Sequence, residues 1–261
     1  MKFQLFGKEL WDMSRIPPGL TLYTVRNELE QDFLGTLKKV ADMGYKVVEF
    51  IFNAEGFPAV QIKQALNKLG LNTVSVYVRT EDLERDLNRY IEDAKTIGVR
   101  YIVTRFPREK FADESKFPEL VSFLTRVAKE LKRHGLQLAY HTHDYDFAKA
   151  GGKFIIDILL AGVGTDLLQL ELDTYSVKQA GLDPKATLLK YKGITPLLHV
   201  KDMDRQGGFT EVGRGTIDWP PIFRILKDVG VKYYFVEQNV SAHPLKSAKI
   251  SLDYLKSIGA A

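Results

Sequence analysis

Short apolar runs recur along the chain from residue 19 to residue 237. Each run has the length and the β-branched and aromatic content of a buried strand. The runs begin, in chain order, at Gly19, Lys46, Asn72, Arg100, Leu136, Leu167, Thr195 and Tyr233. Between them lie segments such as 33–41 and 83–94, in which apolar residues have helical spacing and charged residues occupy the other face. The pattern therefore predicts strands that alternate with amphipathic helices.

Glycine, proline and aspartate mark the predicted element boundaries. Glycine stands between a helical segment and the next strand, where it ends helices in the left-handed conformation, at Gly44, Gly70, Gly98 and Gly135. Helix starts are predicted at Thr80, at Asp183 before Pro184, and at Asp218 before Trp219. About eight repeats of strand, helix and glycine are typical of a (β/α)8 TIM barrel, an α/β fold.

A doubly wound open sheet is the competing fold. Such a sheet usually carries a glycine-rich phosphate turn after an early strand, whereas the first strand here continues as LYTVRNE without glycine. No linker or low-complexity tract divides the chain. We therefore predict a single barrel domain over residues 19–261, preceded by an N-terminal extension over residues 1–18.

Polar residues end four of the predicted strands in the second half of the chain. They are His141, Asp173, His199 and Glu237, and Glu49 follows the same alternation in the second strand. In a TIM barrel the carboxyl ends of the strands meet at one face, which is where active sites lie. Two imidazoles and two carboxylates suit one divalent ion such as Mn²⁺, Co²⁺, Zn²⁺ or Mg²⁺. The alternative is that each residue only caps a strand or joins a buried ion pair.

Strand alternation also predicts which side chains face the barrel interior. In the sixth run Asp173 shares a face with Glu171, whereas Leu170 and Leu172 would pack against helices. In the seventh run His199 and Lys201 share a face. Buried charges need a partner or a metal, because desolvating them alone is too costly.

Further residues are candidates for contact with a substrate. His143 and Lys201 follow the fifth and seventh strands, and Lys201 suits an oxyanion or forms a salt bridge to Asp202, Glu171 or Glu237. The substrate-binding candidates are Arg26, Glu49, Arg105, His143, Glu211 and Arg214. The last two lie in the glycine-rich segment EVGRGTIDW, which matches neither a P-loop nor a dinucleotide fingerprint.

Composition narrows the class of protein. The 261 residues include no cysteine, which excludes disulfides, thiolate metal sites and a cysteine nucleophile. The net charge is +4, but the basic residues are spread along the chain, which disfavours nucleic acid as a partner. No run approaches a membrane span, and the first residues do not resemble a signal peptide. We therefore expect a cytoplasmic protein with no membrane partner, and a homo-oligomer stays an open alternative.

The motifs together resemble the xylose isomerase-like TIM barrel superfamily, and within it the sugar phosphate isomerase/epimerase group. The resemblance runs from about residue 19 to the C-terminus and rests on LYTVR, GYKVVEF, YHTHDYDF, LELDTYSV, HVKD and EVGRGTIDW in that order. It implies one divalent metal held by strand-end side chains and a sugar or sugar derivative as substrate. Five histidines are too few for the trinuclear zinc site of the related endonuclease IV branch, so DNA repair is rejected.

The ligand pattern departs from the keto-sugar epimerase branch at one position. That branch uses a glutamate, an aspartate, a histidine and a second glutamate, and Asp173, His199 and Glu237 match the last three. His141 stands where the first glutamate would be, which puts a mechanism with two symmetric carboxylates in doubt. The inosose dehydratase-like and related lyase branches also resemble this chain.

These observations predict a metal-dependent sugar isomerase or epimerase. Glu237 would remove a proton α to a carbonyl, and His141 or Lys201 would return a proton or stabilise the enolate. A lyase or dehydratase acting on inososes or 3-keto-glycosides through the same enolate is the first alternative. A non-catalytic sugar-binding barrel is the second.

Overall fold

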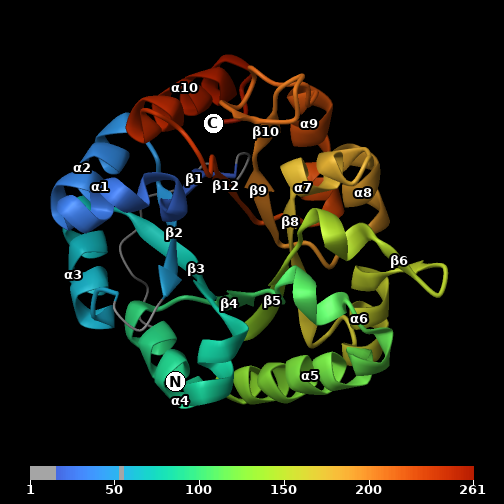
Figure 1. Ribbon diagram of the computed structural model, residues 1–261. Helices are drawn as coiled ribbons and strands as arrows, with labels where there is room; N and C mark the ends of the chain where they lie inside the picture. Colours follow the sequence, from blue (N-terminus) through green and yellow to red (C-terminus); the bar gives the residue numbers. More distant parts are fainter. Residues whose placement is uncertain (1–15, 53–55) are drawn as a thin grey trace.

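A computed structural model describes residues 16–52 and 56–261. In these residues parallel strands close into a barrel, in the order β1-β12-β9-β8-β5-β4-β3-β2 (Figure 1). The eight strands are β1 (Pro18–Thr21), β2 (Val47–Phe52), β3 (Asn72–Val78), β4 (Tyr101–Thr104), β5 (Gln137–His141), β8 (Leu168–Asp173), β9 (Leu197–Val200) and β12 (Tyr233–Val236). The predicted TIM barrel is confirmed. The predicted extension falls almost wholly on residues 1–15, which lie outside the described residues.

Helices form a ring around the strands (Figure 1). They are α1 (Arg26–Gln31), α2 (Phe33–Met43), α3 (Ala59–Leu69), α4 (Thr80–Ile97), α5 (Phe117–Arg133), α6 (Ile155–Val163), α7 (Thr174–Gln179), α8 (Pro184–Lys190), α9 (Trp219–Val229) and α10 (Pro244–Ser257). Among the described residues no helix is long and apolar enough to cross a membrane.

Two apolar cores flank the barrel wall. Leu168, Leu170 and Leu172 are fully buried in the large core that includes the helix faces, as strand alternation predicts. A smaller cluster, which includes Tyr101, Val103, Ala139, Leu197 and Phe235, is separate from that large core. Because these residues alternate with the outward-facing ones, they fill the barrel interior. Charged side chains that continue the same inward rows must therefore lie at the open, carboxyl end of the barrel.

The helix boundaries agree closely with the sequence expectations. The four predicted glycines have positive φ angles, from 63° at Gly70 to 110° at Gly44. Asp183 caps α8 by accepting a hydrogen bond from the backbone N–H of Ala186 at 2.7 Å. Helix α9 begins at Trp219 with Asp218 at its N-cap, although the Asp218 side chain makes no capping bond.

The first predicted strand is too long. Residues Leu22–Val25 form the 3₁₀ helix η1 instead, and α1 follows at once. Leu22 and Val25 are nevertheless buried in the large core. The backbone turns while the apolar side chains stay inside, so hydrophobicity alone does not distinguish this turn from a strand. The other 3₁₀ helices are η2 (Arg108–Phe111), η3 (Glu114–Lys116) and η4 (Asp144–Phe147).

Two short antiparallel strand pairs lie in the loops at the carboxyl ends of the barrel strands. One pairs β6 (Lys149–Ala150) with β7 (Lys153–Phe154), and the other pairs β10 (Asp202–Met203) with β11 (Phe209–Thr210). Asp202 organises the glycine-rich segment that follows β11. Its Oδ2 accepts hydrogen bonds from the backbone N–H of Gly213 at 2.9 Å and from Nε1 of Trp219 at 2.8 Å. A side chain at Gly215 would overlap Asp202 and the Met203 carbonyl, so these glycines serve loop packing rather than a phosphate.

Candidate metal centre and active site

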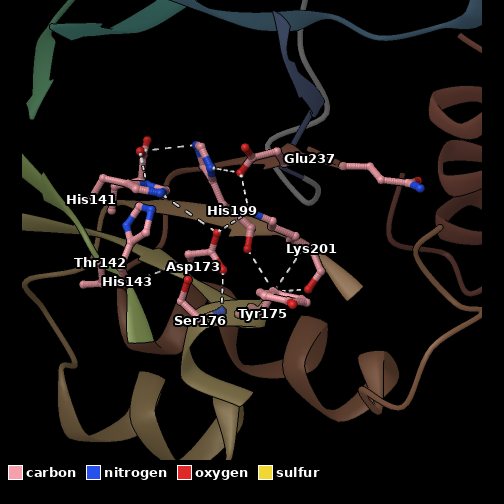
Figure 2. Close-up of polar contacts among 12 residues, drawn as sticks. His141, Thr142, His143, Asp173, Tyr175, Ser176, His199, Lys201 and Glu237 are labelled. Atoms are coloured by element: carbon pink, nitrogen blue, oxygen red, sulfur yellow. Dashed lines mark hydrogen bonds and ion pairs between the residues drawn. The ribbon is translucent and has the colours of Figure 1, made fainter. Parts of the chain in front are cut away.

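Four side chains converge at the carboxyl ends of neighbouring strands. His141 ends β5, Asp173 ends β8, His199 lies in β9 and Glu237 follows β12, and these strands are adjacent in the barrel. All four side chains are buried, and one ligand atom from each lies within 4.8 Å of the others. Figure 2 shows them pointing toward one another. The structure therefore brings together the four residues predicted as metal ligands.

His199 is held by carboxylates on both ring nitrogens. Its Nδ1 lies 2.7 Å from Oε2 of Glu237, and its Nε2 lies 2.8 Å from Oε2 of Glu49 and 3.2 Å from Oε2 of Glu171. A metal-binding imidazole usually donates its second N–H to a carboxylate, which fixes the ring and its tautomer. If Nε2 donates to Glu49 and Glu171, then Nδ1 is free to face Glu237 and a shared metal.

Glu171 contacts both imidazoles of the cluster. Its Oε2 lies 2.9 Å from Nδ1 of His141, and the other nitrogen of that ring, Nε2, lies 4.0 Å from Oδ2 of Asp173. Glu171 Oε1 is buried and has no hydrogen-bond partner. Burial raises the pKa of Glu171 to about 8, and the nearby charge of Glu49 raises it as well. The carboxylate of Glu171 therefore contacts both candidate histidine ligands and can orient their rings.

The residues present fit a divalent ion. Glu49, Glu171, Asp173 and Glu237 are all at most 6% exposed, and Lys201 is the one lysine in salt-bridge contact with this group among the described residues. Without a metal, raised pKa values keep Glu171 largely protonated and His199 cationic at neutral pH, so a divalent ion would displace those protons and balance the carboxylates that the Lys201 ammonium leaves uncompensated. Nitrogen and carboxylate oxygen donors in this ratio suit Mn²⁺, Co²⁺, Zn²⁺ or Mg²⁺.

Lys201 bridges two of the candidate ligands. Its Nζ lies 3.3 Å from Oδ2 of Asp173 and 3.5 Å from Oε2 of Glu237, and it stands over the rings of Tyr175 and Phe209. Burial by itself lowers the pKa of Lys201, but the charges of Asp173 and Glu237 raise it above its usual value. Of the salt bridges considered from the sequence, the one to Glu237 is present. Lys201 is therefore a fixed positive charge at the edge of the cluster.

A pocket of about 260 Å³ opens over this cluster. The side chains around it come from most of the barrel strands and the loops that follow them: Thr21, Tyr23, Glu49, Ile51, Tyr77, Arg79, Arg105, His141, His143, His199, Lys201, Glu237 and Asn239. Three of the predicted substrate-binding residues, Glu49, Arg105 and His143, are among them. The pocket is of a size for a small molecule, and its polar groups surround the candidate metal ligands.

The other predicted substrate-binding residues lie outside the residues that line this pocket. Arg26 stacks on Tyr23 and donates hydrogen bonds to the carbonyls of Tyr23 and Asn239. Glu211 accepts a hydrogen bond from Ser247 at 2.9 Å, and Arg214 lies 3.8 Å from Glu211. These contacts are ones that a structural role would also produce, so a substrate role for Arg26, Glu211 and Arg214 stays a prediction.

A hydrogen-bonded loop after β5 positions His143. The buried Asp146 accepts hydrogen bonds from the backbone N–H of His143 at 2.7 Å and from the hydroxyl of Tyr140 at 3.0 Å. The His143 ring stacks on Tyr145, and its Nδ1 is buried without a hydrogen-bond partner. Burial, with help from the charge of Arg105, lowers the pKa of His143 to about 4. His143 is therefore a neutral side chain that lines the pocket.

Several pocket residues escaped the sequence reasoning. Tyr77 stands near the carboxyl end of β3, one of the predicted strands, and its ring meets His141 edge-on at 6.5 Å. Its position near the end of a predicted strand could have identified it as a pocket residue. Arg79 and Asn239 follow strand ends in the same way. Glu171 was placed on the inward face, but its link to two histidines depends on the register of β8 against both β5 and β9.

Comparison with known proteins places the chain among relatives that share this fold. It is 26% identical to an inosose dehydratase of Geobacillus kaustophilus (strain HTA426), over 84% of this chain and 85% of that protein. A crystal structure of a sugar phosphate isomerase/epimerase from Parabacteroides distasonis ATCC 8503 superposes with a TM-score of 0.81 at 21% identity, covering 92% of this chain and 98% of that one.

A zinc-bound structure also shares the fold. The IolI protein, crystallised with a bound zinc atom, superposes with a TM-score of 0.70 at 15% identity, covering 93% of this chain and 96% of that one. A family profile described as xylose isomerase-like TIM barrel matches residues 37–258, which is most of the chain. The chain therefore belongs to the xylose isomerase-like TIM barrel family.

Proposed function

We propose that this protein is a divalent-metal-dependent enzyme that removes a proton next to the carbonyl of a keto sugar or keto polyol. The four-residue cluster would hold the ion, and the pocket above it would hold the substrate. Support comes from the buried donor set of two imidazoles and two carboxylates, and from relatives named for sugar and inosose chemistry. A zinc atom in a structure of the same fold agrees with a metal in this family.

The surroundings of the two carboxylate oxygens of Glu237 are the main support for this proposal. Oε2 contacts Nδ1 of His199 and Nζ of Lys201, so it faces the cluster. Oε1 makes no hydrogen bond within the described part of the chain, and the residue lines the pocket. Burial alone would raise the pKa of Glu237, but the charges of Lys201 and His199 lower it to about 2. The low pKa keeps Glu237 ionised, and its position at the junction of cluster and pocket, rather than its basicity, makes it the candidate general base.

The chemistry follows from these positions. A divalent ion bound by His141, Asp173, His199 and Glu237 would polarise the carbonyl as a Lewis acid. Glu237 takes the proton from the adjacent carbon, and the electron pair of that C–H bond forms the enolate. Lys201, beside Glu237, offers positive charge to the negative oxygen. His141, with one nitrogen bound to Glu171, acts as a ligand here rather than as the proton donor.

Two outcomes are open to such an enolate. In elimination, a lone pair of the enolate oxygen re-forms the carbonyl and the C=C electron pair of the enolate forms a double bond between the α and β carbons. The bond from the β carbon to its hydroxyl breaks with the electrons on oxygen, and Glu237 returns its proton to that oxygen. The products are an unsaturated ketone and water. In isomerisation or epimerisation, a carbon or oxygen of the enolate takes up a proton instead and nothing leaves.

We favour elimination. His141 occupies the strand end at which the epimerase pattern has a glutamate, so a symmetric pair of carboxylates is missing from the ligand set. The curated relative described above is named as a dehydratase, at higher identity than the isomerase/epimerase structure. Isomerase or epimerase activity is the second candidate, supported by the shared enolate. A non-catalytic sugar-binding barrel is the third, and the Glu237 arrangement speaks against it.

A substrate screen with two readouts tests the proposal. The protein loaded with Mn²⁺ or Co²⁺ is incubated in D₂O with keto sugars, inososes and 3-keto-glycosides, and deuterium uptake and enone absorbance are both followed. Enone formation that chelation abolishes would support elimination, and deuterium uptake without enone would support isomerisation. If the loaded protein produced neither signal on any of the three classes, the proposal would be overturned.

A further inference from the structure

Arg105 lies in the catalytic pocket without an acidic partner. It follows β4 and continues the inward row of Tyr101 and Val103. Its Nη1 donates to the hydroxyl of Tyr145 at 3.0 Å, and no carboxylate of the described residues comes within 4.0 Å of its guanidinium. Arg79, which lines the same pocket, is instead paired with Asp82 at 2.7 Å. Of these two arginines, Arg105 alone keeps its charge uncompensated.

Tyr145 holds the Arg105 side chain in place without neutralising it. The Tyr145 hydroxyl donates its own proton to the carbonyl of Phe106 at 2.8 Å, so a lone pair remains to accept from Arg105. A guanidinium has five N–H donors, and this contact uses one of them. The remaining donors of a partly buried cation need acceptors, because water is only partly available there.

Two neighbouring groups also lack partners. The hydroxyl of Tyr77 makes no hydrogen bond within the described part of the chain, and Nε2 of His143, the ring nitrogen that is not buried, makes none either. Both residues line the pocket together with Arg105. Tyr145 connects two of the three groups, because its ring stacks on His143 at 5.3 Å and its hydroxyl accepts from Arg105. The rings of Tyr77 and His143 both pack against His141. This part of the pocket offers donors and a positive charge but no carboxylate of its own.

The barrel places this donor group across from the proposed base. In the strand order, three strands separate β4 from β12 in either direction, so the two strands are diametrically opposite. Glu237 follows β12, and Arg105 follows β4. A substrate with one end at Glu237 and the cluster would extend its other end toward Arg105.

We propose that the substrate carries an anionic oxygen group, a carboxylate or a phosphate monoester, and that Arg105 binds it. Tyr77 and His143 add hydrogen bonds to the same group. Guanidinium pairs with carboxylates and phosphates through two parallel hydrogen bonds, which gives both affinity and orientation. This inference rests on the proposed function only where it concerns the reacting end of the substrate. The preference for an anion depends on Arg105 and not on the reaction.

A matched set of ligands tests the inference by calorimetry. D-Glucose, D-glucuronate and D-glucose 6-phosphate share one ring and differ at carbon 6, and inorganic phosphate and acetate report the anion alone. Binding is measured for the wild-type protein, Arg105→Gln and Arg108→Gln, each with metal and after chelation. Arg108 is the control, because it also contacts the Tyr145 ring but pairs with Asp144 at 2.6 Å.

The expected result is a preference of about tenfold or more for a charged ligand over D-glucose, as hydrogen bonds to charged groups supply. Arg105→Gln should lose that preference, and Arg108→Gln should keep it. The stronger of the two sugar anions would identify the group as carboxylate or phosphate. Equal binding of neutral and charged sugars, an unchanged preference in Arg105→Gln, or no binding of any charged probe would each overturn the inference.

The chelated samples separate this inference from the proposed function. An anion preference that depends on Arg105 should survive removal of the metal, since Arg105 is not one of the cluster residues. If no metal-dependent reaction were found but the preference for charged sugars persisted, only the proposed function would be wrong. If the metal-dependent reaction were found but no preference for charged sugars depended on Arg105, only the inferred anion site would be wrong.

Discussion

Oε2 of Glu171 lies 2.9 Å from Nδ1 of His141, and the same oxygen lies 3.2 Å from Nε2 of His199. One carboxylate therefore sets the orientation of both imidazoles in the candidate metal centre. His141 and Glu171 are register partners across β5 and β8, so the barrel backbone itself creates the first contact. Carboxylates that hold metal-binding histidines in this way raise the basicity of the ligand and fix its tautomer.

Replacing Glu171 by glutamine should weaken metal binding by about 10- to 100-fold. Both histidines contact the same oxygen, so an amide that keeps its oxygen there still accepts from both rings, but it carries no charge and holds them less firmly. Metal affinity is measured by competition with a chromophoric chelator, and the absorption spectrum of the Co²⁺ form should change as well. Glu119→Gln makes the same chemical change at an exposed position on α5 and serves as the control. Equal affinities in Glu171→Gln and the control would exclude the orienting role.

Replacing Glu237 by glutamine should reduce turnover by about 100-fold or more, because an amide cannot take up the proton. The fold should remain, which circular dichroism and thermal melting can check. Turnover is compared on whichever substrate the screen reveals, with deuterium exchange as an independent readout of proton removal. Exchange that persisted at the wild-type rate would show that another group is the base.

Replacing Asp202 by asparagine should lower the free energy of unfolding by about 1–3 kcal/mol, as loss of buried hydrogen-bond acceptors does. Oδ2 of Asp202 accepts from Gly213, Gly215 and Trp219, so an NH₂ group there would face three donors. The control is Asp218→Asn in the same segment, whose exposed side chain makes no capping bond and should change stability by less than about 0.5 kcal/mol. Denaturant unfolding measures both, and similar values would refute the role of Asp202.

Asp146 should make stability fall with rising pH. Burial raises the pKa of Asp146 to about 8, against a value of about 4 in an unfolded chain. The folded state then binds the proton more tightly, so this contribution is present below about pH 4 and is lost as the pH rises to about 8. Unfolding free energies at several pH values should show a flatter slope for Asp146→Asn. Asp228→Asn, at an exposed position on α9, makes the same chemical change and serves as the control. An unchanged slope in Asp146→Asn would contradict the raised pKa.

Strand periodicity was enough to predict the barrel and the meeting of four strand-end side chains, whose role as metal ligands stays a prediction. Because alternate residues face inward and parallel strands share one carboxyl end, His141, Asp173, His199 and Glu237 had to meet if the strands were right. The turn at Leu22–Val25 could not be predicted this way, because three of its four side chains, those of Leu22, Thr24 and Val25, are buried as strand residues would be.

Contacts between residues that lie far apart in the chain could not be predicted from the sequence. The sequence does not reveal that Glu211 contacts Ser247, or that Asp202 accepts hydrogen bonds from five backbone or ring donors, because those contacts depend on how loops pack. The lack of an acidic partner at Arg105 is likewise a property of the folded neighbourhood. The sequence predicted Arg105 as a pocket residue, but only the structure distinguishes it from the paired Arg79.

Metal content of the purified protein tests the central claim most directly. Elemental analysis of the wild-type protein and of Asp173→Asn is made after dialysis against Mn²⁺, Co²⁺ or Zn²⁺ and removal of free ion. We expect about one divalent ion per wild-type chain, lost on chelation and strongly reduced in Asp173→Asn while the fold is retained. A folded wild-type protein that kept none of the three ions, or an Asp173→Asn variant that kept a full equivalent, would contradict it.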